Sequence, residues 1–477
     1  MGTGYGSGRP GCGQQAAAPD AGGARPLREP RSLHDPAGAA ARLSAFGRIP
    51  GHRHLFQAAR LRDLRRLPGQ HRLVTPVTAD GPDALLPGTL RQAIDATSVA
   101  TLRARRSAKW TAPGPDGYGA GVAEMDFGAS PAILDALARL SAEANFGYLP
   151  SWLAEELSSA CAAFARRRYG WDVDPHCIHP VPDVIRGLEL AITHFSRPGS
   201  PVILPTPAYM PFLSVPGMLG RDIISVRMLE KEPGYFIFDL DGLESAFRAG
   251  GHMLIFCNPY NPLGRVFTRA EIAELTDVVD RHDGRVFADE IHAPLVYPGR
   301  KHIPYAATSE TAAGHTLTAT SASKAWNLPG LQCGVLILSN RPDQERWARL
   351  GHLETRGASN PGVAASIAAF NEGEVWLDEV IGYLDDSRAL LGDLLNQYLP
   401  QVRYRQPEGT YLAWLNCAAM DLPGSPGTLV IDRAHVTVVD GPDFGDGGAG
   451  AFRFNFATPQ PILTEMVERI ATALSAR

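Results

Sequence analysis

The pattern of apolar and polar residues changes near residue 130, where short apolar runs begin to alternate with helical periodicity. Runs of this kind, bounded by Pro, Gly or polar residues, are typical of strands that are buried on both faces of a sheet. Five of them stand out, at 201–205 (PVILP), 253–257 (MLIFC), 285–289 (RVFAD), 316–320 (TLTAT) and 334–338 (GVLIL).

Helices are predicted between and before these strands. Apolar residues recur with helical spacing over 131–142 and 153–169. Thr268 precedes Glu271 by three residues, which is a capping box, and predicts a helix that runs to about His282. A strand, a helix and a strand in this order predict a right-handed parallel crossover. We therefore expect an α/β domain with a mostly parallel sheet, whose ligands bind beyond the carboxyl ends of the strands.

After about residue 345 the strand pattern weakens, which predicts a second, smaller α+β domain over 346–477. Its elements are helices at 364–372 and 375–398, strand-like segments at 410–416 and 452–456, and a loop at 440–450 that five glycines make flexible.

The first 90 residues have a different composition, with twelve Arg, no Lys and six Asp or Glu. They contain few apolar runs, so disorder is expected, and a nucleic-acid-binding arm or a later start of translation are alternatives. The expected organisation is an extension (1–90), an arm that joins the small domain (91–130), a large α/β domain (131–345) and the small domain (346–477).

Composition excludes several classes of protein. A net charge of −5 gives no basic field for nucleic acid or an anionic membrane. No apolar stretch is long enough for a transmembrane helix, and no signal peptide is visible. The six cysteines form no CxxC pair and have no zinc-type spacing, which predicts a reduced, cytoplasmic protein without a metal.

Three polar residues follow successive apolar strands: Asn261, Asp289 and Lys324. Singly they have ordinary explanations, namely an Asn-Pro turn, a helix cap or ion pair, and a solvated lysine. Together they supply a donor for a phenolic oxygen, an acid for a pyridinium nitrogen and an imine-forming amine, which are the partners that pyridoxal 5′-phosphate needs.

The segments NPYNPLG, FADE and SASK match the aspartate-aminotransferase superfamily in order, and the chain resembles the pyridoxal-phosphate enzymes of fold type I. AEMDF (123–127), FGY (146–148), DEIH (289–292) and SASKAWNLPGL (321–331) further resemble the MalY/PatB-like cystathionine β-lyases, the carbon–sulfur lyase branch. The resemblance covers about residues 92–477.

This resemblance implies roles for individual residues. Lys324 is the Schiff-base lysine, Asp289 the partner of the ring nitrogen and Asn261 the partner of the ring oxygen. His292 stands near that oxygen where many aminotransferases have Tyr, and Tyr209 stacks on the ring; a structural His and a core Tyr are the alternatives. Residues implied at the phosphate are the backbone amides of Val184 and Ile185 at a helix start that Asp183 caps, the hydroxyls of Ser321 and Ser323, and Tyr148 from the second subunit of a homodimer.

For the substrate, the resemblance implies that Arg453 binds the α-carboxylate, with a surface arginine as the alternative. Asp126 and Phe127 line the entrance or belong to the core. Many aminotransferases have an arginine eight residues after the lysine, whereas this chain has Gln332, which favours the lyase branch.

The resemblance implies β-elimination from cystathionine or a related cysteine S-conjugate, which releases a thiol, pyruvate and ammonia. Transamination is the alternative, because it shares the early steps. A non-catalytic binding protein of the same fold is a third hypothesis.

Overall fold

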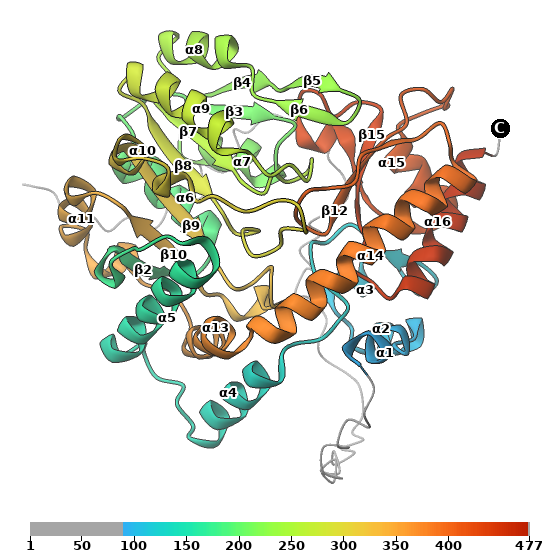
Figure 1. Cartoon of the computed structure of the whole chain (residues 1–477), viewed down its shortest axis with the longest axis horizontal. Helices are drawn as coiled ribbons and strands as arrows, with labels where there is room; N and C mark the ends of the chain where they lie inside the picture. The colour runs from blue at the N-terminus through green and yellow to red at the C-terminus, as the bar shows by residue number, and fades with distance from the viewer. Residues whose placement is uncertain (1–88, 476–477) are drawn as a thin grey trace, which may run out of the picture. The chain divides into compact units, whose positions relative to one another are not determined.

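A seven-stranded sheet forms the centre of the described chain, in a computed structural model that describes residues 89–475 (Figure 1). Six strands run in the same direction, and only β10 runs against its two neighbours. The strand order is β2-β10-β9-β8-β7-β3-β4. The bounds are β2 Ile178–Val181, β3 Val202–Thr206, β4 Ile223–Arg227, β7 Met253–Cys257, β8 Arg285–Asp289, β9 Thr316–Thr320 and β10 Gly334–Leu338.

The five predicted strands are confirmed, four with identical bounds and β3 displaced by one residue. Every residue of β3, β7 and β10 is buried, as expected for strands covered on both faces. The reversal of β10 has a simple cause. Between β9 and β10 the chain has only the short 3-10 turn Pro329–Leu331 and no α-helix, whereas the crossover to a parallel partner usually contains a helix.

Helices cover the sheet along its length (Figure 1). α6 packs on β9 and β10, α7 and α8 pack on β3 and β4, and α5 packs on β2. The capping box is confirmed, because Thr268 and Glu271 each accept a hydrogen bond from the other's backbone N–H at the start of α9. The bounds are α5 Ser151–Tyr169, α6 Val184–Leu190, α7 Met210–Met218, α8 Leu240–Arg248, α9 Arg269–Arg281, α10 Glu310–His315 and α11 Arg341–Ala348.

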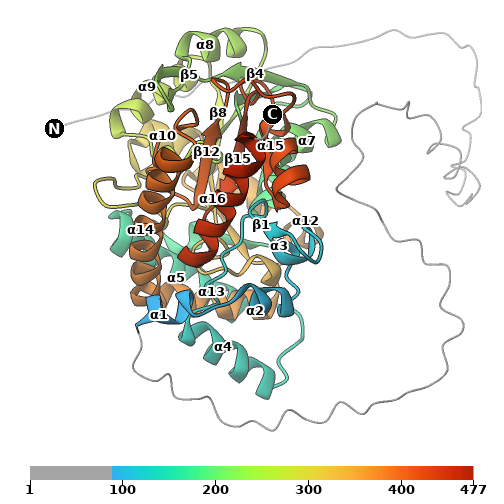
Figure 2. The ribbon, with the colours of Figure 1, turned by 90° about the vertical axis from the view of Figure 1, so that its right-hand side faces the viewer.

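A four-stranded antiparallel sheet follows, in the order β11-β12-β15-β14. In Figure 2 the long helices α14 and α16, which pack on each other, lie in front of β12 and β15. The helices and strands predicted after residue 345 are confirmed as α13, α14, β12 and β15. The domain boundaries at 130 and 345 stay a prediction. The bounds are β11 Arg403–Tyr404, β12 Leu412–Asn416, β14 Val439–Asp440, β15 Ala451–Asn455, α12 His352–Thr355, α13 Asn360–Glu372, α14 Glu374–Tyr398, α15 Pro426–Leu429 and α16 Gln460–Ser475.

The glycine-rich loop 440–450 is packed rather than open. It contains a 3-10 turn, Gly441–Phe444, and the Phe444 ring is buried. The Ala208 amide donates to the Phe444 carbonyl at 2.8 Å, which joins the loop to the end of β3. These contacts argue against the flexibility expected from its glycine content.

The N-terminal arm joins the C-terminal part of the described chain. β1 pairs in parallel with β13, and α1 packs on α14. None of the helices between residues 89 and 475 has both the length and the apolar character needed to cross a bilayer. The remaining bounds are α1 Leu90–Asp95, α2 Val99–Ala104, α3 Ala108–Thr111, β1 Tyr118–Gly119, α4 Pro131–Ala142, β5 Leu229–Glu232, β6 Tyr235–Ile237 and β13 Val436–Thr437.

A buried ion pair fixes the arm. The ammonium group of Lys109 lies 2.9 Å from Asp126 Oδ2, and both side chains are almost fully buried. Trp110 Nε1 donates to the second carboxylate oxygen at 2.8 Å, and Lys109 also donates to the Glu124 and Ala457 carbonyls. Both charges are therefore paired and hydrogen-bonded, which burial requires.

We predict that Asp126→Ala lowers the free energy of unfolding by about 3–5 kcal/mol, because it leaves the Lys109 ammonium buried without a counter-charge. Urea unfolding of the full chain measures this. Glu345→Ala removes one partner of an exposed pair with Arg341 and should cost less than about 0.5 kcal/mol. Equal costs for the two variants would contradict a structural role for Asp126.

Candidate active site

The predicted cofactor residues gather at one edge of the large sheet, where five strands that run in the same direction end. Each strand end is followed within a few residues by one or more of them. Asp183, Val184 and Ile185 follow β2, Tyr209 follows β3, Asn261 follows β7, Asp289 and His292 end and follow β8, and Ser321, Ser323 and Lys324 follow β9.

Lys324 presents a partly buried amine. Its Nζ donates to the Ala123 carbonyl at 3.0 Å. Burial, and then the nearby charge of Arg453, lower the pKa of Lys324 to about 8. A larger share of the amine is therefore unprotonated near neutral pH than for an ordinary lysine, as a nucleophile and a base require.

Asp289 is a buried carboxyl group without a hydrogen-bonded cation among residues 89–475. Its Oδ1 accepts from the Ile291 amide at 3.0 Å. Burial raises the pKa of Asp289 to about 7, although the Ile291 amide and the charge of Lys324 act in the opposite direction. A cationic partner in this position would offset the cost of burying the carboxylate.

Arg453 lies on β15 and reaches the same place. Its Nη1 donates to Asn261 Oδ1 at 3.0 Å, and its Nη2 donates to the Gly121 carbonyl at 2.7 Å. The guanidinium is buried over the ring of Phe444, and its Nε has no hydrogen-bond partner. Further N–H groups are thus left for a carboxylate.

His292 is buried beside these charges, and its Nδ1 has no hydrogen-bond partner. Burial, and then the charges of Lys324 and Arg453, hold the pKa of His292 well below its ordinary value. The imidazole is therefore neutral and can face the phenolic oxygen of a ligand with one free nitrogen. Tyr411 lies edge-on to it, with the ring centres 5.9 Å apart.

The predicted phosphate residues are partly supported by their surroundings. Asp183 caps α6 by accepting from the Arg186 amide at 2.7 Å, which confirms the predicted cap. The hydroxyl of Ser321, in contrast, donates to the Cys333 carbonyl at 2.6 Å, so its proton is already used, whereas the hydroxyl of Ser323 has no partner within residues 89–475. Gln332 is exposed in a left-handed conformation (φ 51°).

Three other predicted residues have different surroundings. Tyr148 is 99% exposed, in the loop between α4 and α5. Both carboxylate oxygens of Asp126 are engaged by Lys109 and Trp110. Phe127 is buried and packs edge-on to Tyr383 at 5.2 Å. The surroundings of Asp126 and Phe127 favour a structural role, and their contact with substrate stays a prediction.

Sequence reasoning missed Tyr411 and Asn455. The Tyr411 hydroxyl donates to the Ala123 carbonyl at 2.9 Å, and Asn455 Nδ2 donates to the two flanking carbonyls, Val122 at 2.6 Å and Glu124 at 2.7 Å. Tyr411 resembles an ordinary core residue in a strand-like segment. An amide inside the apolar run FRFNF was a signal that could have been followed, since a buried amide must find partners.

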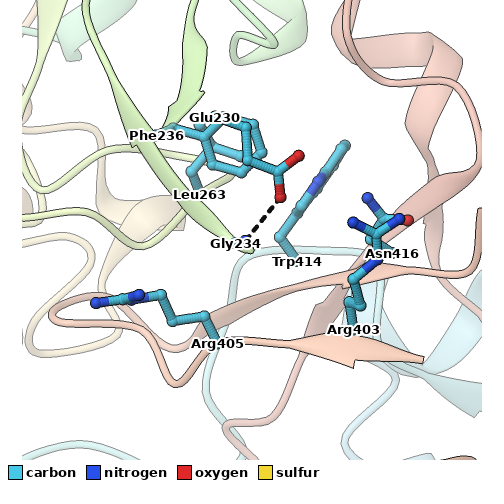
Figure 3. A pocket seen from close by; sticks show the side chains of 8 residues that line it. All are labelled: Glu230, Gly234, Phe236, Leu263, Arg403, Arg405, Trp414 and Asn416. Atoms are coloured by element: carbon cyan, nitrogen blue, oxygen red, sulfur yellow. Dashed lines mark hydrogen bonds between the residues drawn. The ribbon is translucent and has the colours of Figure 1, made fainter. Parts of the chain in front are cut away.

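A pocket between the β5–β6 hairpin and β12 lies apart from this set of residues. Figure 3 shows its eight lining side chains, among them Arg403, Arg405 and Trp414. None of the predicted site residues lines it, and Glu230 inside it already accepts from the Gly234 amide at 2.7 Å. The candidate site is therefore at the strand ends.

The residues at the strand ends fit pyridoxal phosphate. Asp289 is a buried carboxyl group without a cationic hydrogen-bond partner, and the Nδ1 of His292 and the Nε of Arg453 are buried without partners. These are the groups that a pyridine ring, a phenolic oxygen and an amino-acid carboxylate would complete. A partly buried lysine and a capped helix start lie beside them.

Comparisons with known proteins agree. Residues 118–470 match the model of the family "aminotransferase class I and II". Cystathionine β-lyase of Corynebacterium glutamicum is 40% identical over 78% of this chain and 98% of its own length, and cystathionine β-lyase PatB of Bacillus subtilis is 32% identical over 78% and 97%. The crystal structure of a putative pyridoxal-phosphate-dependent β-cystathionase from Corynebacterium diphtheriae superposes with a TM-score of 0.75 at 40% identity, over 80% of this chain and 99% of that one. The fold is thus fold type I, and the chain belongs to the class I and II aminotransferase family, within the group that contains the cystathionine β-lyases.

Proposed function

We propose that this chain is a pyridoxal-phosphate-dependent carbon–sulfur β-lyase that acts on cystathionine or a related cysteine S-conjugate. The observation that carries the proposal is that Asn261, Asp289 and Lys324 stand at or after the ends of three neighbouring parallel strands, with Arg453 hydrogen-bonded to Asn261. The lowered pKa of Lys324 is consistent with this arrangement. The 40% identity to a cystathionine β-lyase supports the type of reaction.

Pyridoxal phosphate, when bound, supplies an electron sink for the negative charge that develops at the α-carbon of an amino acid. Asp289 would pair with the ring nitrogen, and Asn261 and His292 would face the ring oxygen. Tyr209 would lie on the ring face. The residues that would hold the phosphate are Val184 and Ile185, through their amides at the start of α6, and Ser323, with Ser321 fixing the turn before it.

The chain's own groups then divide the work on the substrate. Arg453 binds the α-carboxylate with the N–H groups left free by Asn261 and Gly121. Lys324 takes the α-proton, after which the bond from Cβ to sulfur breaks and a thiolate leaves. The remaining three-carbon fragment hydrolyses to pyruvate and ammonia. A reducing, cytoplasmic location is part of this proposal, since the five described cysteines are buried free thiols.

We predict that the purified chain with added pyridoxal phosphate releases pyruvate and thiol from L-cystathionine without a keto acid. Lys324→Ala should lower kcat by at least about 1,000-fold, because it removes the base and the covalent anchor. Coupled assays of pyruvate and free thiol measure this, and Lys301→Ala, at an exposed lysine, is the matched control.

Two outcomes would contradict the proposed reaction. Turnover that appears only when a keto acid is supplied would make the chain an aminotransferase. An unchanged rate in Lys324→Ala would exclude Lys324 as the base.

Asp289 gives a prediction for the chain before cofactor is added. Its pKa of about 7 lies above its ordinary value of 3.8, so the stability due to its neutral form is present at low pH and is lost as pH rises toward 7. Asp289→Asn cannot ionise. Its advantage over wild type in free energy of unfolding should therefore grow by about 2.5 kcal/mol between pH 5 and pH 8.

Urea unfolding at the two pH values measures this advantage, and Asp222→Asn, at an exposed carboxylate, should show no such growth. The same Asp289→Asn variant should bind pyridoxal phosphate about 10–100-fold more weakly, because it loses a charge-assisted hydrogen bond. Unchanged affinity would contradict the pairing of Asp289 with the ring nitrogen.

The proposed function includes a homodimer. Apolar and aromatic side chains are exposed around the loop between α4 and α5: Leu134 (55%), Phe146 (65%), Tyr148 (99%) and Trp152 (58%). Asn360 Nδ2 donates to the Gly147 carbonyl at 3.1 Å and so fixes this loop. A fixed, exposed aromatic surface is typical of an interface. A second copy would cover it and would place Tyr148 at the partner's phosphate.

We predict that co-expressed Tyr148→Ala and Lys324→Ala subunits regain activity that neither variant shows alone. Each mixed dimer holds one site with native Lys324 and, from the other subunit, native Tyr148, so a random mixture should reach about one quarter of wild-type activity. Separately tagged subunits allow the mixed dimer to be purified and assayed. Lys324→Ala with Asp289→Asn is the control, because both changes affect a subunit's own site. Equal recovery in both mixtures would contradict a shared site.

A further inference from the structure

Residues 121–126 form an unusual backbone segment, because each of their six consecutive carbonyl groups accepts a hydrogen bond from a side chain. We call them the carbonyl row. The donors come from the arm, from the segment that follows β9 and from the C-terminal sheet. Arg453 donates to the Gly121 carbonyl and Asn455 to those of Val122 and Glu124. Lys324 and Tyr411 both donate to Ala123, and Lys109 also donates to Glu124. Asn327 donates to Met125, and Arg105 donates to Asp126.

The Ala123 carbonyl is the member of the row that receives the reactive lysine. Lys324 Nζ lies 3.0 Å and the Tyr411 hydroxyl 2.9 Å from this one oxygen. A carbonyl oxygen has two lone pairs, so these two donors saturate it. Tyr411 therefore competes with Lys324 for the same acceptor.

We propose that Tyr411 is a positioning residue that keeps the Lys324 amine unprotonated by occupying one lone pair of the Ala123 carbonyl. An ammonium group donates a stronger hydrogen bond to a carbonyl than a neutral amine does. A second donor on the oxygen weakens that preference, since its hydrogen carries partial positive charge. The hydroxyl thus favours the free amine, which is the form that removes a proton; in this respect the inference rests on the proposed function.

The geometry leaves Tyr411 and Ala123 little freedom to part. Tyr411 is 1% exposed, and the Phe456 amide donates to its carbonyl at 3.1 Å. Asn455 holds the carbonyls on either side of Ala123. The Ala123 carbonyl is thereby fixed toward Lys324 and Tyr411, and the hydroxyl has a single acceptor.

Other charged and titratable groups face Lys324 from each neighbouring element. Arg453 on β15 adds to the effect of burial and lowers the pKa of Lys324, whereas Glu124 in the carbonyl row and Asp289 at the end of β8 raise it. His292, in the loop after β8, is neutral. All of these remain when only the Tyr411 hydroxyl is removed, so a change in Lys324 can be assigned to that hydroxyl.

The test is Tyr411→Phe in the full chain, with two measurements of Lys324. The first is the pH dependence of its trinitrophenylation in cofactor-free protein, followed by mass spectrometry of the peptide that contains Lys324. The second is the acid limb of the kcat–pH profile of the loaded enzyme with L-cystathionine. Both midpoints should move upward by about 0.5–1 pH unit, and kcat at pH 7 should fall about 3–10-fold.

Tyr297→Phe is the matched control. Tyr297 is also buried, and its hydroxyl donates to the backbone carbonyl of Thr410 at 2.6 Å, next to Tyr411 in the chain but away from Lys324. Its loss should cost similar stability without moving either midpoint. If Tyr411→Phe does not fold, 3-fluorotyrosine at position 411 provides the test, because a stronger donor should move both midpoints downward.

Two results would overturn the inference: midpoints in Tyr411→Phe that match those of Tyr297→Phe, or a downward shift. The modification experiment needs no turnover. It therefore still reports on Lys324 if cystathionine proves not to be a substrate, and the failure of this inference can be told apart from the failure of the proposed function.

Discussion

The hydrogen bond from Lys324 Nζ to the Ala123 carbonyl joins two parts of the chain that are 201 residues apart. It exists because the carbonyl row has no strand partner of its own there and takes its hydrogen bonds from side chains instead. Arg453 and Asn455 reach the row from β15, and Lys109 reaches it from the arm. The positions of Lys324 and Arg453 thus depend on one stretch of backbone, and backbone groups that are buried must be paired.

The chemistry of this site comes from ionisable side chains that are removed from water without a full set of hydrogen-bonding or charged partners. Asp289, Lys324 and His292 each have a pKa displaced by burial toward the neutral form. A protein that needed only stability would gain by replacing such groups with apolar ones. Here the cost is offset only when a ligand supplies the missing charge and hydrogen-bonding groups. The folded protein therefore bears a cost of burial that cofactor binding relieves. Strongly perturbed groups that gather at strand ends are a physical sign of a functional site.

The sequence predicts the large sheet well because strands buried on both faces need continuous apolar runs, as β7 and β8 show. It also predicts α9, because a capping box is local chemistry. It could not identify the partners of Tyr411 and Asn455, which are backbone carbonyls 288 and 333 residues away. Every residue carries a carbonyl, so such a bond leaves no trace in the identity of its acceptor. The carboxylate of Asp126 could be assigned to substrate because the sequence alone does not show that the side chains of Lys109 and Trp110 already engage it.

The phosphate side of the site follows a similar logic. Gln332 stands where an arginine would supply charge, and it is exposed in a left-handed conformation. Neutral donors can hold a phosphate nevertheless, because backbone amides at a helix start point at the anion and the helix dipole favours negative charge. Gly334 supports this arrangement: a Cβ there would come within 3.3 Å of the Asp183 backbone, so glycine lets β10 approach the start of α6 closely. With neutral donors on one side, the proposed contribution of Tyr148 from a second copy would add one more uncharged donor to the phosphate site, because a tyrosine hydroxyl carries no charge at neutral pH.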